Sequence, residues 1–278
     1  MKNYSEISNR YMKQNKKRTS LTIIGITLAT ILIFAVGTFL LSFRDSMLVE
    51  QRRTGGDYEF ILRNITSEQV DKIKNNAEVK DTSLLLSSDD EYRIEGKDEI
   101  LTFEYGNKDY YEKMQTSPIK EGRVPTKENE ILINQSVKSL LKVNVGDKID
   151  LKDANGNEKV VEVVGIEEGT LYSGNNVFYV KDYLNDKNLD QNAEYNLYLN
   201  LKSGKNKQEI IAKITEQNNI NKESINNNSN VLYLTGNGGN EYVSGALRNM
   251  AIFVIATIIV CTIVVIYNSF NISVIERI

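Results

Sequence analysis

Histidine and tryptophan are absent from this sequence, and cysteine occurs once, at Cys261. These absences exclude a histidine-ligated metal, a Ser/His/Asp or Cys/His catalytic group, a four-cysteine zinc site and an intramolecular disulfide. The formal charge of −3 and the pI near 5.4 give no general attraction to nucleic acid, so we expect no nucleic-acid partner. Much of enzyme chemistry is therefore excluded by composition.

Charged residues are also absent from a long apolar segment near the N-terminus, Leu21 to Phe43. About 20 apolar residues in a helix cross the hydrocarbon core of a bilayer, so this segment predicts a transmembrane helix. It is too long for the apolar region of a cleaved signal peptide. Gly25 and Ala29 form a small-xxx-small pattern on which another helix can approach closely.

A second uncharged segment, Met250 to Phe270, predicts a second span. It contains Cys261, which we interpret as a small packing residue. Six Lys or Arg residues and one acid occupy positions 1–20, directly before the first span. The positive-inside rule therefore places the N-terminus in the cytoplasm, and two spans return the chain end to the same side.

The two predicted spans divide the chain into five parts. Positions 1–20 form a cytoplasmic basic tail, 21–43 the first transmembrane helix, 44–249 an external domain, 250–270 the second transmembrane helix, and 271–278 the start of a cytoplasmic region. The external part has a formal charge of −8, which attracts cationic ligands or simply keeps the domain soluble. It is long enough to bury a core of its own.

Short apolar stretches alternate with turn residues throughout the external part, which predicts an α+β domain. Expected strands are 58–62, 130–134, 176–180 and 195–201, with a hairpin centred on Asn155-Gly156. Expected helices are 135–142, 207–217 and one opened by a capping box of Thr66 and Gln69. The Asn-rich segment 218–230 and the Gly-rich segment 235–242 are interpreted as loops.

Candidate ligand sites in this domain have simpler explanations. No Lys-Ser/Thr follows the Gly-rich segment 235–242, so it does not match a phosphate-binding loop. DANGN at 153–157 resembles the start of a calcium loop, but Glu158 and Val164 occupy the places of the required Gly and Glu, which favours a hairpin turn. The acids at 89–91 are interpreted as a solvated turn. We predict no catalytic, metal or cofactor site.

Two segments of the external part carry recognisable motifs. PIKEGRVPTKENEILINQSVKSLLKVNVGDKIDL runs from Pro118 to Leu151, and VVEVVGI from Val160 to Ile166. They resemble the FtsX-like, MacB-type permeases of ABC transporters, whose outer core domain has a Gly-Arg, a turn rich in Asn and Glu, a strand, a helix ending in Val-Gly-Asp and a strand ending in Val-Gly-Ile. The matching positions are Gly122, Arg123, Glu130, Val145, Gly146, Asp147, Val164, Gly165 and Ile166.

The resemblance implies a MacB-type core domain inserted between two transmembrane helices in the bacterial cell membrane. It implies a non-catalytic permease subunit without a cofactor, partnered by a cytoplasmic ATPase that binds ATP and by a second permease copy or a paralogue. In such systems the substrate is a peptide, lipid or lipoprotein. The motif glycines, Arg123 and Asp147 are expected to be structural. ATPase contact is expected at Asn271, Ser273, Glu276 and Arg277.

Members of the family continue past a stretch like ERI with more chain and two further spans, whereas this sequence stops at Ile278, so we expect a fragment. Two other functions stay open. A sensor or receptor would bind an envelope ligand or antimicrobial peptide without transport and would signal to a histidine kinase. A membrane-anchored enzyme would show hydrolytic activity in residues 44–249.

Overall fold

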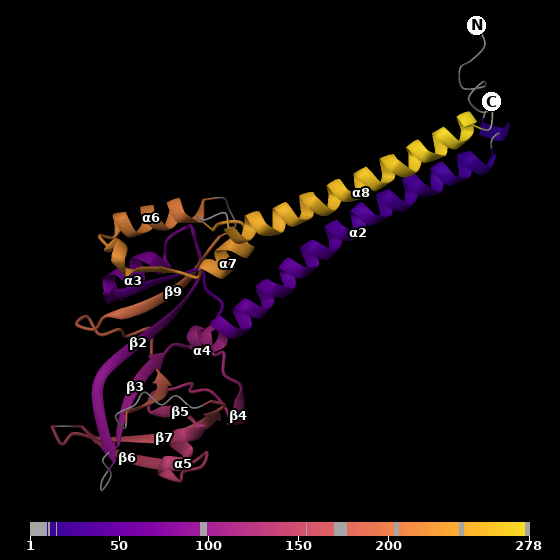
Figure 1. Ribbon diagram of the computed structural model, residues 1–278. Helices are drawn as coiled ribbons and strands as arrows, with labels where there is room; N and C mark the ends of the chain where they lie inside the picture. The colour runs from indigo at the N-terminus through magenta and orange to yellow at the C-terminus, as the bar shows by residue number, and fades with distance from the viewer. Residues whose placement is uncertain are drawn as a thin grey trace. The chain divides into compact units, whose positions relative to one another are not determined.

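The computed structural model describes residues 10, 12–14, 16–94, 99–153, 155–169, 177–202, 206–238 and 242–275. The chain forms two compact units (Figure 1). One consists of Met1–Met47 with Asn240–Ile278, and the other of Leu48–Gly239. The first unit is helical, and the second contains all the strands of the described residues.

The helical unit is built from α2 (Lys16–Gly55) and α8 (Tyr242–Ile275). Its segment Thr19–Gly55 is long and apolar enough to cross a membrane, with a mean hydropathy of 2.5 in its most apolar window. None of that window is buried by protein, which distinguishes it from a soluble core helix. In the described part of α8 the apolar stretch, Ile252–Val264, is shorter than a span requires. The second span and the membrane orientation therefore stay predictions.

The unit Leu48–Gly239 is called the outer unit below, because the sequence predicts it outside the membrane. A four-stranded antiparallel sheet forms its first half, in the order β10 (Ile225–Asn227), β1 (Phe60–Ile65), β9 (Tyr195–Leu201), β2 (Val79–Ile94). The helices α3 (Ser67–Lys74), α6 (Lys207–Gln217) and α7 (Ser229–Leu234) pack against it, with the short 3-10 helix η1 (Lys222–Ser224) before β10. Their common core includes Phe60, Val70, Leu197, Ile211 and Leu232. Apolar burial of this kind stabilises a domain by about 25 cal/mol per Å².

Six strands close into a barrel in the second half. These are the end of β2, β3 (Ile100–Gly106), β8 (Val177–Tyr183), β5 (Glu130–Asn134), β7 (Glu158–Glu167) and β6 (Lys148–Asp153). Each pairs with the next, and β6 pairs back to β2, so the ring has no open edge. Alternate residues from the strands fill the interior, among them Leu101, Phe103, Ile131, Val163 and Val180.

The long strand β2 belongs to both halves (Figure 1). Val79–Leu85 pairs with β9, and Tyr92–Ile94 pairs with β6. At one end of the barrel, α5 (Gln135–Leu141) contributes Val137 to the interior. Outside the ring lie β4 (Ile119–Gly122), which pairs with β7, and α4 (Lys108–Met114), which packs near β2 and β3.

Several predictions from local sequence signals are confirmed. The Thr66 hydroxyl accepts from the Gln69 amide at 3.3 Å, and the Gln69 side chain accepts from the Thr66 amide at 3.0 Å, as in a capping box. The strand 130–134, the helix after it and the hairpin around Asn155-Gly156 are present as β5, α5 and β6–β7. The α+β class is therefore correct.

Two local interpretations are wrong. The acids at 89–91 are part of strand β2, beside a register shift between Ser87 and Glu91, and not a solvated turn. The Asn-rich segment is not a loop, because it contains η1, β10 and the start of α7. Asn221 and Asn228 act as helix caps there, which is a common role of asparagine that mimics a loop composition.

Candidate functional site

Two motif glycines, Gly122 and Gly165, lie where the paired strands β4 and β7 approach each other very closely. Gly122, at the end of β4, is opposite Gly165 in β7. A Cβ on Gly122 would lie 2.1 Å from the Val164 carbonyl oxygen, and a Cβ on Gly165 would lie 2.1 Å from the Arg123 carbonyl oxygen. Gly122 also has a φ of +73°, which L side chains rarely adopt. Glycine at both positions therefore permits this backbone contact.

Arg123 joins the same turn to the start of β5. Its guanidinium donates to both carboxylate oxygens of Glu130, at 2.6 and 2.5 Å, and Thr126 donates its amide to Glu130 at 2.9 Å. Glu130 is 2 % exposed. The bonds from Arg123 outweigh the cost of burial and lower the pKa of Glu130 from its ordinary 4.5 to about 2. This ion pair holds the turn against the barrel and leaves no free charge for chemistry.

Acid should weaken the outer unit through Glu130. Because the pKa of Glu130 is depressed on folding, its stabilisation is complete above pH 4.5 and is lost as the pH falls towards about 2. The loss should be on the order of 1–2 kcal/mol, since Arg123 is half-exposed and water screens the pair. We expect Glu130→Gln to flatten the fall in unfolding free energy below pH 4.5, as measured by urea unfolding. Glu128→Gln changes an exposed neighbour and should keep the wild-type dependence of the unfolding free energy on pH. The same dependence in all three proteins would contradict the assignment of this acid sensitivity to Glu130.

Asp147 and Gly146 close the turn between α5 and β6. The Asp147 carboxylate accepts from the Asn144 amide at 2.8 Å, and Gly146 donates its amide to the Val163 carbonyl at 2.8 Å. Gly146 has a φ of +96° with open space around it. These residues shape the backbone and present no reactive group.

The structure describes no side-chain contacts for the four residues that are expected to contact an ATPase. Asn271 and Ser273 lie in the last turns of α8, where the structure describes the backbone only. Glu276 and Arg277 lie outside the described residues. Their role therefore stays a prediction.

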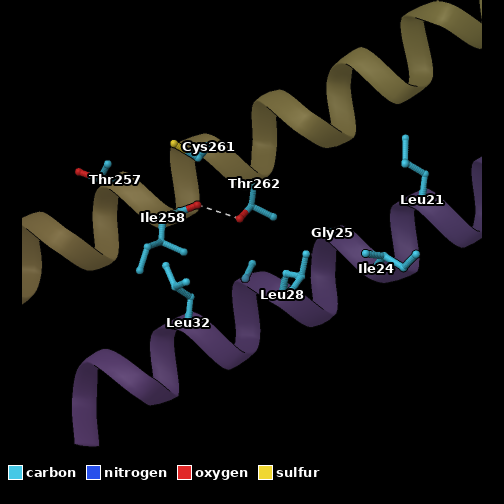
Figure 2. A pocket seen from close by; sticks show the side chains of 10 residues that line it. Leu21, Ile24, Gly25, Leu28, Leu32, Thr257, Ile258, Cys261 and Thr262 are labelled. Carbon is cyan, nitrogen blue, oxygen red and sulfur yellow. Dashed lines mark hydrogen bonds between the residues drawn. The ribbon is translucent and has the colours of Figure 1, made fainter. Parts of the chain in front are cut away.

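An apolar groove separates α2 and α8 over part of their length (Figure 2). Gly25 and Ala29, the small residues of the predicted helix-contact face, line it from α2. From α8 it is lined by Ile258, Cys261 and Thr262, and the Thr262 hydroxyl donates to the Ile258 carbonyl at 2.7 Å. The groove has a volume of about 540 Å³, and the role of the two small residues as a helix-contact face stays a prediction.

A buried ion pair lies inside the barrel. Asp182, 1 % exposed, accepts from the Lys159 ammonium at 2.9 Å and from the Tyr183 amide at 2.7 Å. The ammonium lies over the rings of Phe103 and Tyr105, 4.1 and 4.8 Å from their centroids. Burial raises the pKa of Asp182, and Lys159 opposes this rise.

Sequence reasoning missed this pair, because 23 positions separate the two residues. A signal was present in the alternation of both strands. Lys159 is in phase with the inward residues Val161 and Val163, and Asp182 is in phase with Phe178 and Val180. A lone charge at an apolar position of each of two strands indicates a buried pair.

Metal binding finds no support in the described residues. No group of three or more acidic or cysteine side chains there is placed to hold an ion. Asp153, from the calcium-like motif, accepts from the amides of Asn155 and Asn157 at 2.9 and 2.8 Å and so closes the hairpin.

Comparison with known proteins finds a matching family model and similar solved structures. The family model described as MacB-like periplasmic core domain matches residues 19–217. The extracellular domain of the noncanonic ABC-type transporter YknZ from Gram-positive bacteria is similar at 14% identity and a TM-score of 0.44, over 62% of this chain and 99% of that one. The periplasmic region of MacB from Actinobacillus actinomycetemcomitans is similar at 11% identity and a TM-score of 0.47, over 70% of this chain and 100% of that one.

Proposed function

This chain belongs to the family of ABC transporter permeases with a MacB-like periplasmic core domain, and we propose that it is the subunit through which a separate cytoplasmic ATPase moves the outer domain. The movement exports or removes a peptide, lipid or lipoprotein. The chain works with a second permease copy or a paralogue, as a multi-pass protein of the bacterial cell membrane with its N-terminus in the cytoplasm and its large domain outside. We assign the binding and hydrolysis of ATP to the partner.

The observation that carries this proposal is the continuity of α2. The helix has 40 residues, which at 1.5 Å per residue extend about 60 Å, twice the thickness of the hydrocarbon core. Its last turns, from Leu48 onward, belong to the outer unit. The helix is unbroken from the apolar part to Gly55, which supports the transmission of a displacement from the membrane to the outer unit through α2.

The outer end of α2 is fastened to the outer unit. The Gln51 side-chain oxygen accepts from the side-chain amide of Asn230 in α7 at 2.9 Å, and Arg52 pairs with Asp57 at 3.1 Å. The Asp57 amide donates to the Lys113 carbonyl of α4 at 3.0 Å. A pull or rotation of α2 therefore acts directly on α4 and α7.

On the cytoplasmic side we place the ATPase contact after the second span, at Asn271, Ser273, Glu276 and Arg277. A short helix that continues from a span suits this role, because it transmits force in the same way as α2. The family resemblance and the position of Asn271 and Ser273 in the last turns of α8 support the placement.

The experiment purifies the full-length native protein from its own membranes and compares it with a variant that has three glycines inserted between Ser46 and Met47. We expect an ABC-type ATPase to copurify with both. In the wild-type complex, a non-hydrolysable ATP analogue should change amide hydrogen exchange in Leu48–Gly55 and in α4. The insertion should abolish that change, because each glycine weakens a helix by about 1 kcal/mol and the three together interrupt it.

The same insertion after Gly156, in the exposed hairpin turn, is the matched control and should leave the nucleotide response intact. A nucleotide response that survives the insertion in α2 would rule out α2 as the route. Copurification of a histidine kinase in place of an ATPase would favour the sensor function.

A further inference from the structure

The barrel has an open mouth at the end opposite α5. At this end lie the starts of β5 and β7 and the ends of β3 and β8. A cavity of about 240 Å³ occupies the mouth, between the barrel core and the loop that follows β8. Barrel mouths are places where small ligands commonly bind, and this volume is below the range that drug-sized ligands need. The cavity therefore suits a ligand about as large as one small ring.

The floor of the cavity is polar but balanced in charge. It is formed by the Lys159 and Asp182 pair, and Lys159 also donates to the Tyr105 hydroxyl at 3.1 Å. A buried ion pair contributes little to stability compared with apolar residues of similar size. Stability alone therefore does not account for a charged floor, and a role in polar contact with a ligand would give the pair a function.

The rim supplies amide groups and one acid. Asn129 and Glu128 come from the turn before β5, and Asn185 and Asn188 come from the loop after β8. All four are exposed. In the described part of the chain, no hydrogen bond or ion pair engages the Glu128 carboxylate or the Asn188 side-chain amide. These groups are available to a ligand.

The combination of groups selects the ligand chemistry. Side-chain amides both donate and accept, the Lys159 ammonium donates, and the Glu128 carboxylate accepts. Lys159 and Asp182 neutralise each other at the floor, and Glu128 adds one negative charge at the exposed rim, where water screens it, so an anion is disfavoured and a cation is attracted only weakly. A hydroxyl group both donates and accepts, and it carries no charge. We propose that the barrel mouth binds a neutral ring bearing several hydroxyl groups, of the size of a single sugar residue.

This proposal goes beyond the permease function and does not depend on it, because binding requires neither ATP nor a partner. The experiment measures equilibrium binding of radiolabelled N-acetylglucosamine to the full chain in a detergent without a sugar headgroup. We expect saturable binding with a millimolar dissociation constant, as is usual for so small a ligand. The tetramer of N-acetylglucosamine and its octyl glycoside are measured in parallel. Tighter binding of the tetramer would indicate that the sugar belongs to a glycan, and tighter binding of the octyl glycoside would indicate that it is linked to a lipid.

Three variants make the result specific. Asn188→Leu removes a rim amide and narrows the mouth, and it should weaken sugar binding at least about tenfold. Asn192→Leu, at another exposed position outside the cavity lining, should leave binding unchanged. Glu128→Gln keeps an acceptor and should change sugar binding less than Asn188→Leu does.

Absence of saturable sugar binding, or equal binding by the Asn188 and Asn192 variants, would overturn the proposal. Binding of Nα-acetyl-lysine amide in place of the sugar, abolished by Glu128→Gln, would also overturn it and identify a cation site.

Discussion

Replacing Gly165 by alanine is expected to lower the free energy of unfolding of the outer unit by roughly 3 kcal/mol or more. The added methyl group would lie 2.1 Å from the Arg123 carbonyl oxygen and 3.0 Å from Leu132 Cδ1. The carbonyl belongs to the backbone, which the Arg123 amide fixes through its bond to Val164 at 2.9 Å, so it cannot rotate away as a side chain can. The β4 and β7 strands must separate to accommodate the change. Urea unfolding of the full chain in detergent, followed by tyrosine near-ultraviolet circular dichroism, measures the loss.

The matched control is Gly146→Ala. Gly146 has a φ of +96°, but no atom lies within 4 Å of the place that a Cβ would occupy, so alanine there meets conformational strain without a clash. A left-handed residue other than glycine costs about 1–2 kcal/mol. If Gly165→Ala loses no more stability than Gly146→Ala, the close approach of the two strands in solution is looser than the structure indicates.

The motif glycines illustrate how much the sequence can predict. The resemblance identified Gly122 and Gly165 together with the strand, helix and hairpin between them, because each of these elements has a local signal. Thr66 with Gln69, and Asn155 with Gly156, determine their turns through neighbours at most four positions away. What the sequence could not predict is that the two glycines oppose each other, because their distance depends on how β4 and β7 pair.

Long-range pairing also explains what was missed. Strand β2 has 16 residues and changes its partner from β9 to β6 along its length, so its sequence has no single pattern of apolar alternation. Its acids at 89–91 therefore resembled a turn. The closure of the barrel depends on three paired residues of β2 and β6, Tyr92–Ile94 with Leu151–Asp153, and no local signal marks that contact. The Lys159 and Asp182 pair at the barrel mouth was missed for the same reason.

A second buried ion pair, in the sheet half, gives the other large expected effect. Lys207, at the start of α6, lies 2.5 Å from Glu59 Oε1, and the two residues are 6 % and 3 % exposed. Glu59 also accepts from the Leu201 amide at 3.0 Å. We expect Lys207→Met to destabilise the outer unit by about 3–5 kcal/mol, because it leaves the Glu59 carboxylate buried without a counter-charge. The same urea unfolding measurement tests this.

The double variant Glu59→Met/Lys207→Met separates the cost of an unpaired charge from the value of the pair itself. Replacing both charges with apolar side chains removes the desolvation penalty, so the double variant should be more stable than Lys207→Met alone. It should not recover fully, since the Leu201 amide loses its acceptor and a buried unsatisfied donor costs about 1–3 kcal/mol. Lys72→Met, which breaks the exposed pair with Glu68, should cost less than about 1 kcal/mol. Equal losses for Lys207→Met and Lys72→Met would mean that water reaches the Glu59 carboxylate, and the pair would then hold α6 to the sheet no more firmly than a surface contact does.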